Sequence, residues 1–247
     1  MLTDLTSKIR FGGSMIKLAL KTIKLRRLIR EGDEDKIYEY ATKIGKVHAQ
    51  EALKILDARL HVTGRENIPD VPVLYMGNHQ SYFDPYIMLS LREKRRETYI
   101  AKIEMRKYPV MGDVSEAFGA LFLDRNNPRE GLKTILEAID RINSKGHDVL
   151  IYPEGTRSKG KNLGEFHKGS FKISQKTGCP IVPVVIDNSY KMYDETKKIK
   201  KGQDVYLSFL PPIYPERLSK EEQKNIDEIV KNTIQAELDR LRSTYND

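Results

Sequence analysis

The chain has 247 residues, of which 39% are hydrophobic and 32% charged, a composition typical of a folded protein rather than a disordered one. Its single cysteine, Cys179, excludes an internal disulfide and a cysteine-based metal cluster, and indicates a reducing compartment. The net charge of +8 is concentrated in residues 1–30, which hold eight Lys or Arg and one acidic residue. The rest of the chain holds 35 basic and 34 acidic residues, so its body is close to neutral.

Residues 1–30 predict an amphipathic helix. Ile16, Leu20 and Ile23 share one face of this helix, while lysines line another. No window reaches the roughly 18 uncharged apolar residues that a membrane span needs, and the lysines also argue against a cleavable signal. A basic amphipathic helix suits the surface of an anionic membrane. The alternative is a helix packed on the body with a solvated basic face, and the pattern alone favours neither.

The break at residues 31–35 separates this helix from a second one, which we expect over residues 36–58. From residue 59, apolar strand-like runs alternate with helical patterns, as in an α/β domain with a mostly parallel central sheet. We therefore predict an α/β fold whose central sheet is flanked by helices, with an N-terminal two-helix appendage. Residues 1–58 would be a basic amphipathic membrane-docking segment and residues 59–247 the α/β domain. The expected strands are residues 60–63, 73–76, 97–101, 119–123, 149–152, 181–186 and 205–209.

Residues 76–85, Met-Gly-Asn-His-Gln-Ser-Tyr-Phe-Asp-Pro, lie between an expected strand and an expected helix. Asp84 followed by Pro85 predicts an N-cap followed by proline at the first helical position. On a continuous helix His79 and Asp84 would lie roughly 140° apart, so they can meet only if the chain bends between them. A carboxylate that accepts the Nδ1 proton of an imidazole leaves Nε2 free as a base. The alternative is a capping aspartate beside an unrelated loop histidine.

Three further strands end in polar sequences, at Lys102, at Asp124-Arg125 and at residues 154–157, Glu-Gly-Thr-Arg. The carboxyl ends of strands are where open α/β sheets bind ligands. A base with an orienting acid, together with arginines and a lysine, suits a substrate with a hydroxyl to deprotonate and an anionic group to bind. The alternative is that the arginines form solvated surface ion pairs.

Taken together, these stretches resemble the glycerolipid acyltransferase family, specifically the PlsC-type 1-acyl-sn-glycerol-3-phosphate acyltransferases. Residues 78–84 resemble the catalytic His-x₄-Asp block, and three further blocks follow in the family order over about residues 59–210. Many members carry an apolar, membrane-spanning N-terminus, whereas this one is basic, which favours interfacial docking. The third block begins with Tyr152 where phenylalanine is more usual. The remaining blocks are residues 119–125, 152–158 and 181–184.

The resemblance implies transfer of a fatty acyl group from an acyl carrier protein or coenzyme A thioester to the 2-hydroxyl of lysophosphatidic acid. The product would be phosphatidic acid, in phospholipid biosynthesis, with no metal and no other cofactor. His79 would be the catalytic base and Asp84 its orienting acid. The residues implied in binding the substrate phosphate are Arg125, Arg157 and Lys102, and those implied in shaping the glycerol-phosphate pocket are Glu154, Gly155 and Thr156.

The same residues leave other acceptors and other classes of protein as alternatives. Glycerol-3-phosphate or another lysophospholipid could be acylated by the same mechanism. A lipid hydrolase is disfavoured because no Gly-x-Ser-x-Gly elbow is present. A non-enzymatic membrane or nucleic-acid binder is disfavoured by the near-neutral body, and no nucleic-acid partner is expected. The expected location is the cytoplasmic face of the cell membrane, as a peripheral or monotopic protein.

Overall fold

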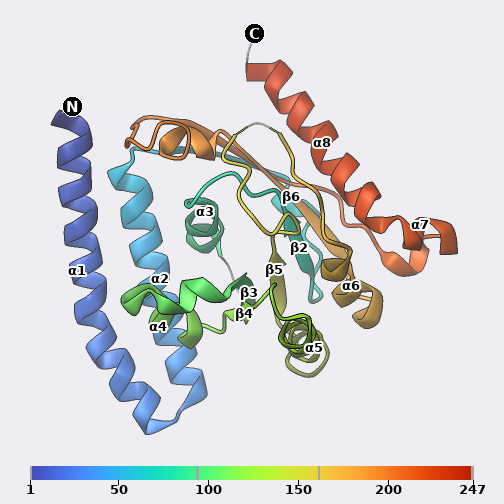
Figure 1. Ribbon diagram of the computed structural model, residues 1–247, viewed down its shortest axis with the longest axis horizontal. Helices are drawn as coiled ribbons and strands as arrows, with labels where there is room; N and C mark the ends of the chain where they lie inside the picture. Colours follow the sequence, from blue (N-terminus) through green and yellow to red (C-terminus); the bar gives the residue numbers. More distant parts are fainter. Residues whose placement is uncertain (1, 93–94, 161, 246–247) are drawn as a thin grey trace.

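A seven-stranded sheet lies at the centre of the computed structural model, which describes residues 2–92, 95–160 and 162–245 (Figure 1). The strand order is β1-β7-β6-β2-β5-β3-β4, and all neighbours are parallel except β6 and β7. The predicted α/β class with a mostly parallel sheet is confirmed. The strands are β1 Arg59–Thr63, β2 Leu74–Gly77, β3 Glu97–Lys102, β4 Leu121–Leu123, β5 Asp148–Ile151, β6 Ile181–Asp187 and β7 Asp204–Phe209.

The three central strands, β6, β2 and β5, are buried along their whole length. Their sequences are nearly continuous apolar runs, because helices cover both faces of a parallel sheet. One face packs against α1 to α4 and the other against α5, α6 and α8, which gives one apolar core on each side. The helices are α1 Leu2–Glu31, α2 Glu34–Ile55, α3 Asp84–Leu91, α4 Pro109–Ala117, α5 Pro128–Lys145, α6 Lys172–Thr177, α7 Lys220–Lys224 and α8 Ile226–Tyr245.

The N-terminal helices α1 and α2 run antiparallel along one side of the molecule, with α1 at the outer edge (Figure 1). Leu18 and Leu25 of α1 are at most 2% exposed, so the hairpin packs on the body. The opposite face of α1 is apolar and faces solvent. No described helix is long and apolar enough to cross a membrane. The outward apolar side chains are Leu5, Ile9, Ile16, Leu20 and Ile23, each 60–66% exposed.

Candidate active site

The His79 and Asp84 side chains meet in the turn between β2 and α3. Nδ1 of His79 lies 2.8 Å from Oδ2 of Asp84, a carboxylate that is fully buried. The same oxygen accepts the backbone N–H groups of Gln80 and Ser81 at 2.7 and 2.8 Å. Because Asp84 Oδ2 acts only as an acceptor here, the network assigns the proton to Nδ1 of His79. Nε2 is then free to act as a base.

The predicted N-cap at Asp84 is wrong. Asp84 is the first residue of α3, Phe83 occupies the N-cap position without a side-chain hydrogen bond, and Pro85 follows inside the first turn. The physical reason is that the Asp84 carboxylate turns back to three donors in the preceding turn and is not available to the helix amides. The chain does bend between His79 and Asp84, as the prediction of their contact requires.

The residues after β5 hold the backbone of His79 on both sides. Glu154 Oε1 accepts the His79 N–H at 2.7 Å, and the Ser158 N–H donates to the His79 carbonyl at 2.8 Å. Oε2 of Glu154 accepts the Gly164 N–H at 2.7 Å. Burial raises the pKa of Glu154, and these two N–H donors oppose that shift. The structure thus makes Glu154 a support of the turn, and its contact with substrate stays a prediction.

Strand β6 anchors the same turn from the other side. The Asn78 side chain exchanges two hydrogen bonds of 2.8 Å with the backbone of Ile186, as a paired strand would. Gln80 Nε2 donates to Oδ1 of Asp187 at 2.9 Å, and Asp187 is 1% exposed. Sequence reasoning missed Asp187, although it is a polar residue at the carboxyl end of a strand and the rule applied to the other strands could have found it.

An apolar cavity of about 260 Å³ opens beside His79. Helices α1 to α4 form its walls, with Leu18 on α1 and Phe118 after α4 among the lining residues. At Gly45 on α2 the wall is closely packed, since an added Cβ would lie 3.3 Å from Leu89 Cδ2. A cavity of this size and character suits a hydrocarbon chain, with the polar group held at the strand ends.

Arg125 is an available cation at the cavity rim. None of the described carboxylates forms an ion pair with it, and its guanidinium packs so closely on Gly155 that an added Cβ there would overlap it. Gly155 has φ of +68°, a conformation that glycine adopts most readily. Partial burial lowers the pKa of Arg125 from its ordinary value, and a bound anion would offset that cost. The predicted residues Lys102 and Thr156 line the same cavity.

Arg157 also lines the cavity, but it is already engaged. Its Nη1 donates to Oδ1 of the buried Asp194 at 3.1 Å, and its guanidinium lies 3.2 Å from the ring centroid of Tyr82. The two arginines predicted to bind phosphate therefore differ: Arg125 is unpaired among the described residues, whereas Arg157 is held in place by Asp194 and Tyr82. Sequence reasoning missed Asp194, which lies in a loop that shows no motif.

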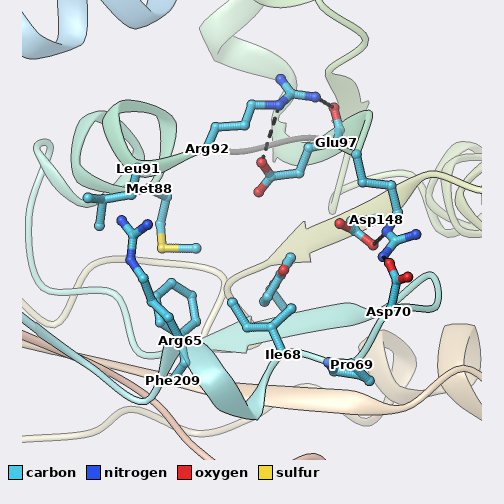
Figure 2. Close-up of a pocket in the computed structure, with 12 residues that line it drawn as sticks. Arg65, Ile68, Pro69, Asp70, Met88, Leu91, Arg92, Glu97, Asp148 and Phe209 are labelled. Carbon is cyan, nitrogen blue, oxygen red and sulfur yellow. Dashed lines mark hydrogen bonds and ion pairs between the residues drawn. The ribbon is translucent and has the colours of Figure 1, made fainter.

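A second cavity, of about 240 Å³, lies at the opposite edge of the sheet, where β3 and β5 begin (Figure 2). Arg92 Nε lies 3.4 Å from Oε2 of Glu97 there, and both side chains are buried. Burial raises the pKa of Glu97 to about 7, although Arg92 acts in the other direction. Since His79 follows the carboxyl end of β2, this second cavity is not part of the catalytic site.

The described residues contain no group of three or more His, Cys, Asp or Glu that could hold a metal ion.

The acyltransferase family model matches residues 59–187, which contain the His79–Asp84 pair, Arg125 and Arg157. The chain belongs to this family. It is 36% identical over 156 residues to a chloroplastic 1-acyl-sn-glycerol-3-phosphate acyltransferase of Brassica napus, covering 62% of this chain and 44% of that one. It is 30% identical over 192 residues to the 1-acyl-sn-glycerol-3-phosphate acyltransferase of Borreliella burgdorferi, covering 77% and 76% of the two chains. The chain thus spans less than half the length of the plant relative.

The fold of this acyltransferase matches a crystal structure over nearly the whole chain. The 1-acyl-sn-glycerophosphate (LPA) acyltransferase PlsC of Thermotoga maritima superposes with a TM-score of 0.79 at 25% sequence identity, covering 98% of both chains. The match includes both N-terminal helices, because so little of either chain lies outside it. The family resemblance and the fold class expected from the sequence are confirmed.

Proposed function

We propose that this acyltransferase moves a fatty acyl group from a thioester donor to the 2-hydroxyl of lysophosphatidic acid, forming phosphatidic acid in phospholipid synthesis. The observation that carries the proposal is the His79–Asp84 pair beside an apolar cavity with the unpaired Arg125 at its rim. The names of the relatives and of the structural neighbour support this acceptor. Glycerol-3-phosphate and other lysophospholipids are the alternatives that the assay below distinguishes.

His79 Nε2 would remove the proton of the acceptor hydroxyl as its oxygen attacks the thioester carbonyl carbon. The Asp84 carboxylate stabilises the imidazolium that forms. When the tetrahedral intermediate collapses, the carbon–sulfur bond breaks and the imidazolium proton passes to the departing thiolate. Ser81 is not the nucleophile in this scheme, because its hydroxyl donates to Asp194 at 2.8 Å rather than to His79. The acyl group therefore passes directly to the acceptor.

The acyl chain would occupy the apolar cavity, while Arg125, Arg157 and Lys102 bind the phosphate at its rim. Gly155 and Thr156 would shape the glycerol-phosphate pocket, with Glu154 beneath it. The donor would be an acyl carrier protein or coenzyme A thioester, and the reaction as written requires no metal or other cofactor.

The same proposal places the protein at the cytoplasmic face of the cell membrane, as a peripheral protein bound to an anionic surface. The outward apolar face of α1 and its flanking lysines support this location, since such helices lie in the membrane interface. Leu18, on the inward face of α1, lines the catalytic cavity. The helix that would bind the bilayer is thus also a wall of the site that receives lipid.

Membrane binding can be tested without damaging the core. Deleting residues 1–30 would also remove the buried Leu18 and Leu25, so we choose Ile16→Ser, Leu20→Ser and Ile23→Ser together. We expect a smaller fraction of the triple variant to sediment with anionic vesicles. High salt should also reduce the fraction of the wild type that sediments with them. The control substitutes by serine two exposed leucines of α5, Leu132 and Leu136, which are 52% and 55% exposed. Equal binding by all three proteins would contradict docking through α1.

An acyl-transfer assay on the wild type and on His79→Ala tests the reaction itself. It offers lysophosphatidic acid, glycerol-3-phosphate and a neutral lysolipid, each with acyl carrier protein and coenzyme A thioesters. We expect product from lysophosphatidic acid and a loss of about 10³-fold or more in the variant. Substantial turnover by a folded His79→Ala protein would remove His79 as the base, and preference for another acceptor would correct the substrate.

A further inference from the structure

Asp194 is a buried carboxylate that joins two motifs of the site. It lies in the loop after β6, its side chain is fully buried, and it falls outside the residues that the family model matches. Its Oδ2 accepts the Ser81 hydroxyl at 2.8 Å and the Tyr82 N–H at 3.1 Å. Its Oδ1 accepts Arg157 Nη1 at 3.1 Å and Lys197 Nζ at 3.4 Å. One oxygen thus faces the catalytic turn and the other faces Arg157.

We infer that Asp194, together with the ring of Tyr82, is a clamp that positions Arg157 for the phosphate of the acceptor and so sets the affinity for that substrate. The inference rests on the proposed function. The Arg157 guanidinium is fixed at one nitrogen by Asp194 and across its face by Tyr82, whose own N–H binds the same carboxylate. Arginine has five N–H donors, so others remain for a phosphate in the cavity that Arg157 lines.

The clamp works by pre-organisation. A long side chain that is already ordered does not have to lose rotamer freedom when the substrate binds, so more of the interaction appears as affinity. Because the Asp194 carboxylate offsets the charge of Arg157, the contribution of Arg157 depends on its geometry rather than on a free positive charge. Arg125 supplies the unpaired charge. Asp194 is accordingly a positioning residue and need not touch the substrate.

Asp194→Asn separates the two halves of this arrangement. The amide oxygen can still accept from Ser81 and Tyr82, which places the NH₂ group opposite the donors of Arg157 and Lys197. Because the NH₂ group cannot accept a hydrogen bond from Arg157, the substitution should release the Arg157 side chain. The hydrogen bonds to Ser81 and Tyr82 should keep the catalytic turn in place. We expect the KM for lysophosphatidic acid to rise about tenfold, as for the loss of one charge-assisted hydrogen bond, and kcat and the KM for the thioester to change less than about twofold.

Lys197→Ala is the matched control, because Lys197 binds the same oxygen from an exposed position and such pairs contribute little. We expect it to leave all three kinetic constants unchanged. Arg157→Gln alone should also raise the KM for lysophosphatidic acid. Adding Asp194→Asn to Arg157→Gln should then have no further effect, because a residue that acts through another is non-additive with it.

The outcomes separate the inference from the proposed function. If Arg157→Gln raises the acceptor KM but folded Asp194→Asn does not, or if the two effects add, the clamp is overturned and the function stands. If Arg157→Gln leaves the acceptor KM unchanged, the phosphate contact itself is wrong, and the inference fails with it. If Asp194→Asn does not fold, Tyr82→Leu tests the clamp in its place. Tyr82 is 53% exposed, so the fold should tolerate this substitution, and its ring covers Arg157. An unchanged acceptor KM in Tyr82→Leu would then overturn the clamp.

Discussion

The imidazole of His79 stacks on the ring of Tyr152, with ring centroids 4.3 Å apart and planes inclined by 15°. Tyr152 directly follows β5 and begins the third sequence block, residues 152–158. Its ring packs against His79, which belongs to the first block, residues 78–84. Together with the hydrogen bond from Nδ1 to Asp84, this contact fixes both the plane and the rotation of the imidazole. The proposed base is therefore already oriented for proton transfer.

Two substitutions of Tyr152 test the roles of its ring and its hydroxyl separately. The hydroxyl is buried without a hydrogen-bond partner among the described residues, and burial raises the pKa of Tyr152 well above its usual value. We expect Tyr152→Phe to retain kcat with an equal or higher Tm, and Tyr152→Ala to lower kcat about 10- to 100-fold. Steady-state kinetics and thermal unfolding measure both. A large loss of activity in Tyr152→Phe would mean that the hydroxyl takes part in catalysis.

Asp84→Asn tests whether the proposed orienting acid acts through its negative charge. All three donors meet Oδ2, while Oδ1 is buried without a partner among the described residues, so an amide can keep the contacts and lose only the charge. We expect kcat to fall about 10²-fold or more, with little change in either KM. Asp113→Asn, at an exposed ion pair with Arg26, is the control. A fully active Asp84→Asn protein would show that the imidazolium needs no carboxylate.

Gly155→Ala tests the position of Arg125. The new methyl group would overlap the guanidinium, and the positive φ would add backbone strain. We expect Arg125 to be displaced and the KM for lysophosphatidic acid to rise about tenfold or more, with a smaller effect on the thioester. Gly160→Ala, in the following loop, has open space around it and serves as the control. A selective rise in the KM for the thioester would instead place the donor at Arg125.

Glu97→Gln tests the second cavity through the pH dependence of stability. The pKa of Glu97 is raised from 4.5 to about 7 by burial, so between these values the unfolded chain releases a proton that the folded protein keeps. The free energy of unfolding of the wild type should therefore fall as pH rises through this window, by up to about 3 kcal/mol.

Urea unfolding between pH 4 and 8 measures this slope. We expect it to be smaller in Glu97→Gln and unchanged in Glu66→Gln, which replaces an exposed carboxylate. Turnover should be unaffected, because Glu97 begins β3 at the edge of the sheet opposite His79. An identical pH slope in the wild type and in Glu97→Gln would show that Glu97 is ionised in the folded protein throughout this range.

The sequence by itself determined the α/β class and the succession of strands along the chain, and its resemblance to the PlsC-type family predicted the His79–Asp84 pair, which the spacing alone left open. These features depend on short-range patterns: apolar runs mark strands that are buried on both faces, and a turn of six residues brings the pair together. Local reasoning failed at Asp84, which it assigned to the helix cap. The helix amides and the preceding turn compete for the same carboxylate, and spacing does not reveal which of them it binds.

Tertiary structure alone decided which charges are free. Arg125 and Arg157 look equivalent in the sequence, yet Asp194, which lies 37 residues beyond Arg157, engages only one of them. It also decided that α1 buries Leu18 while exposing Ile16 and Leu20, because packing on α2 and α4 selects the buried face. A buried ion pair and a buried helix face both depend on which distant segments the sheet brings together, and no local pattern encodes that arrangement.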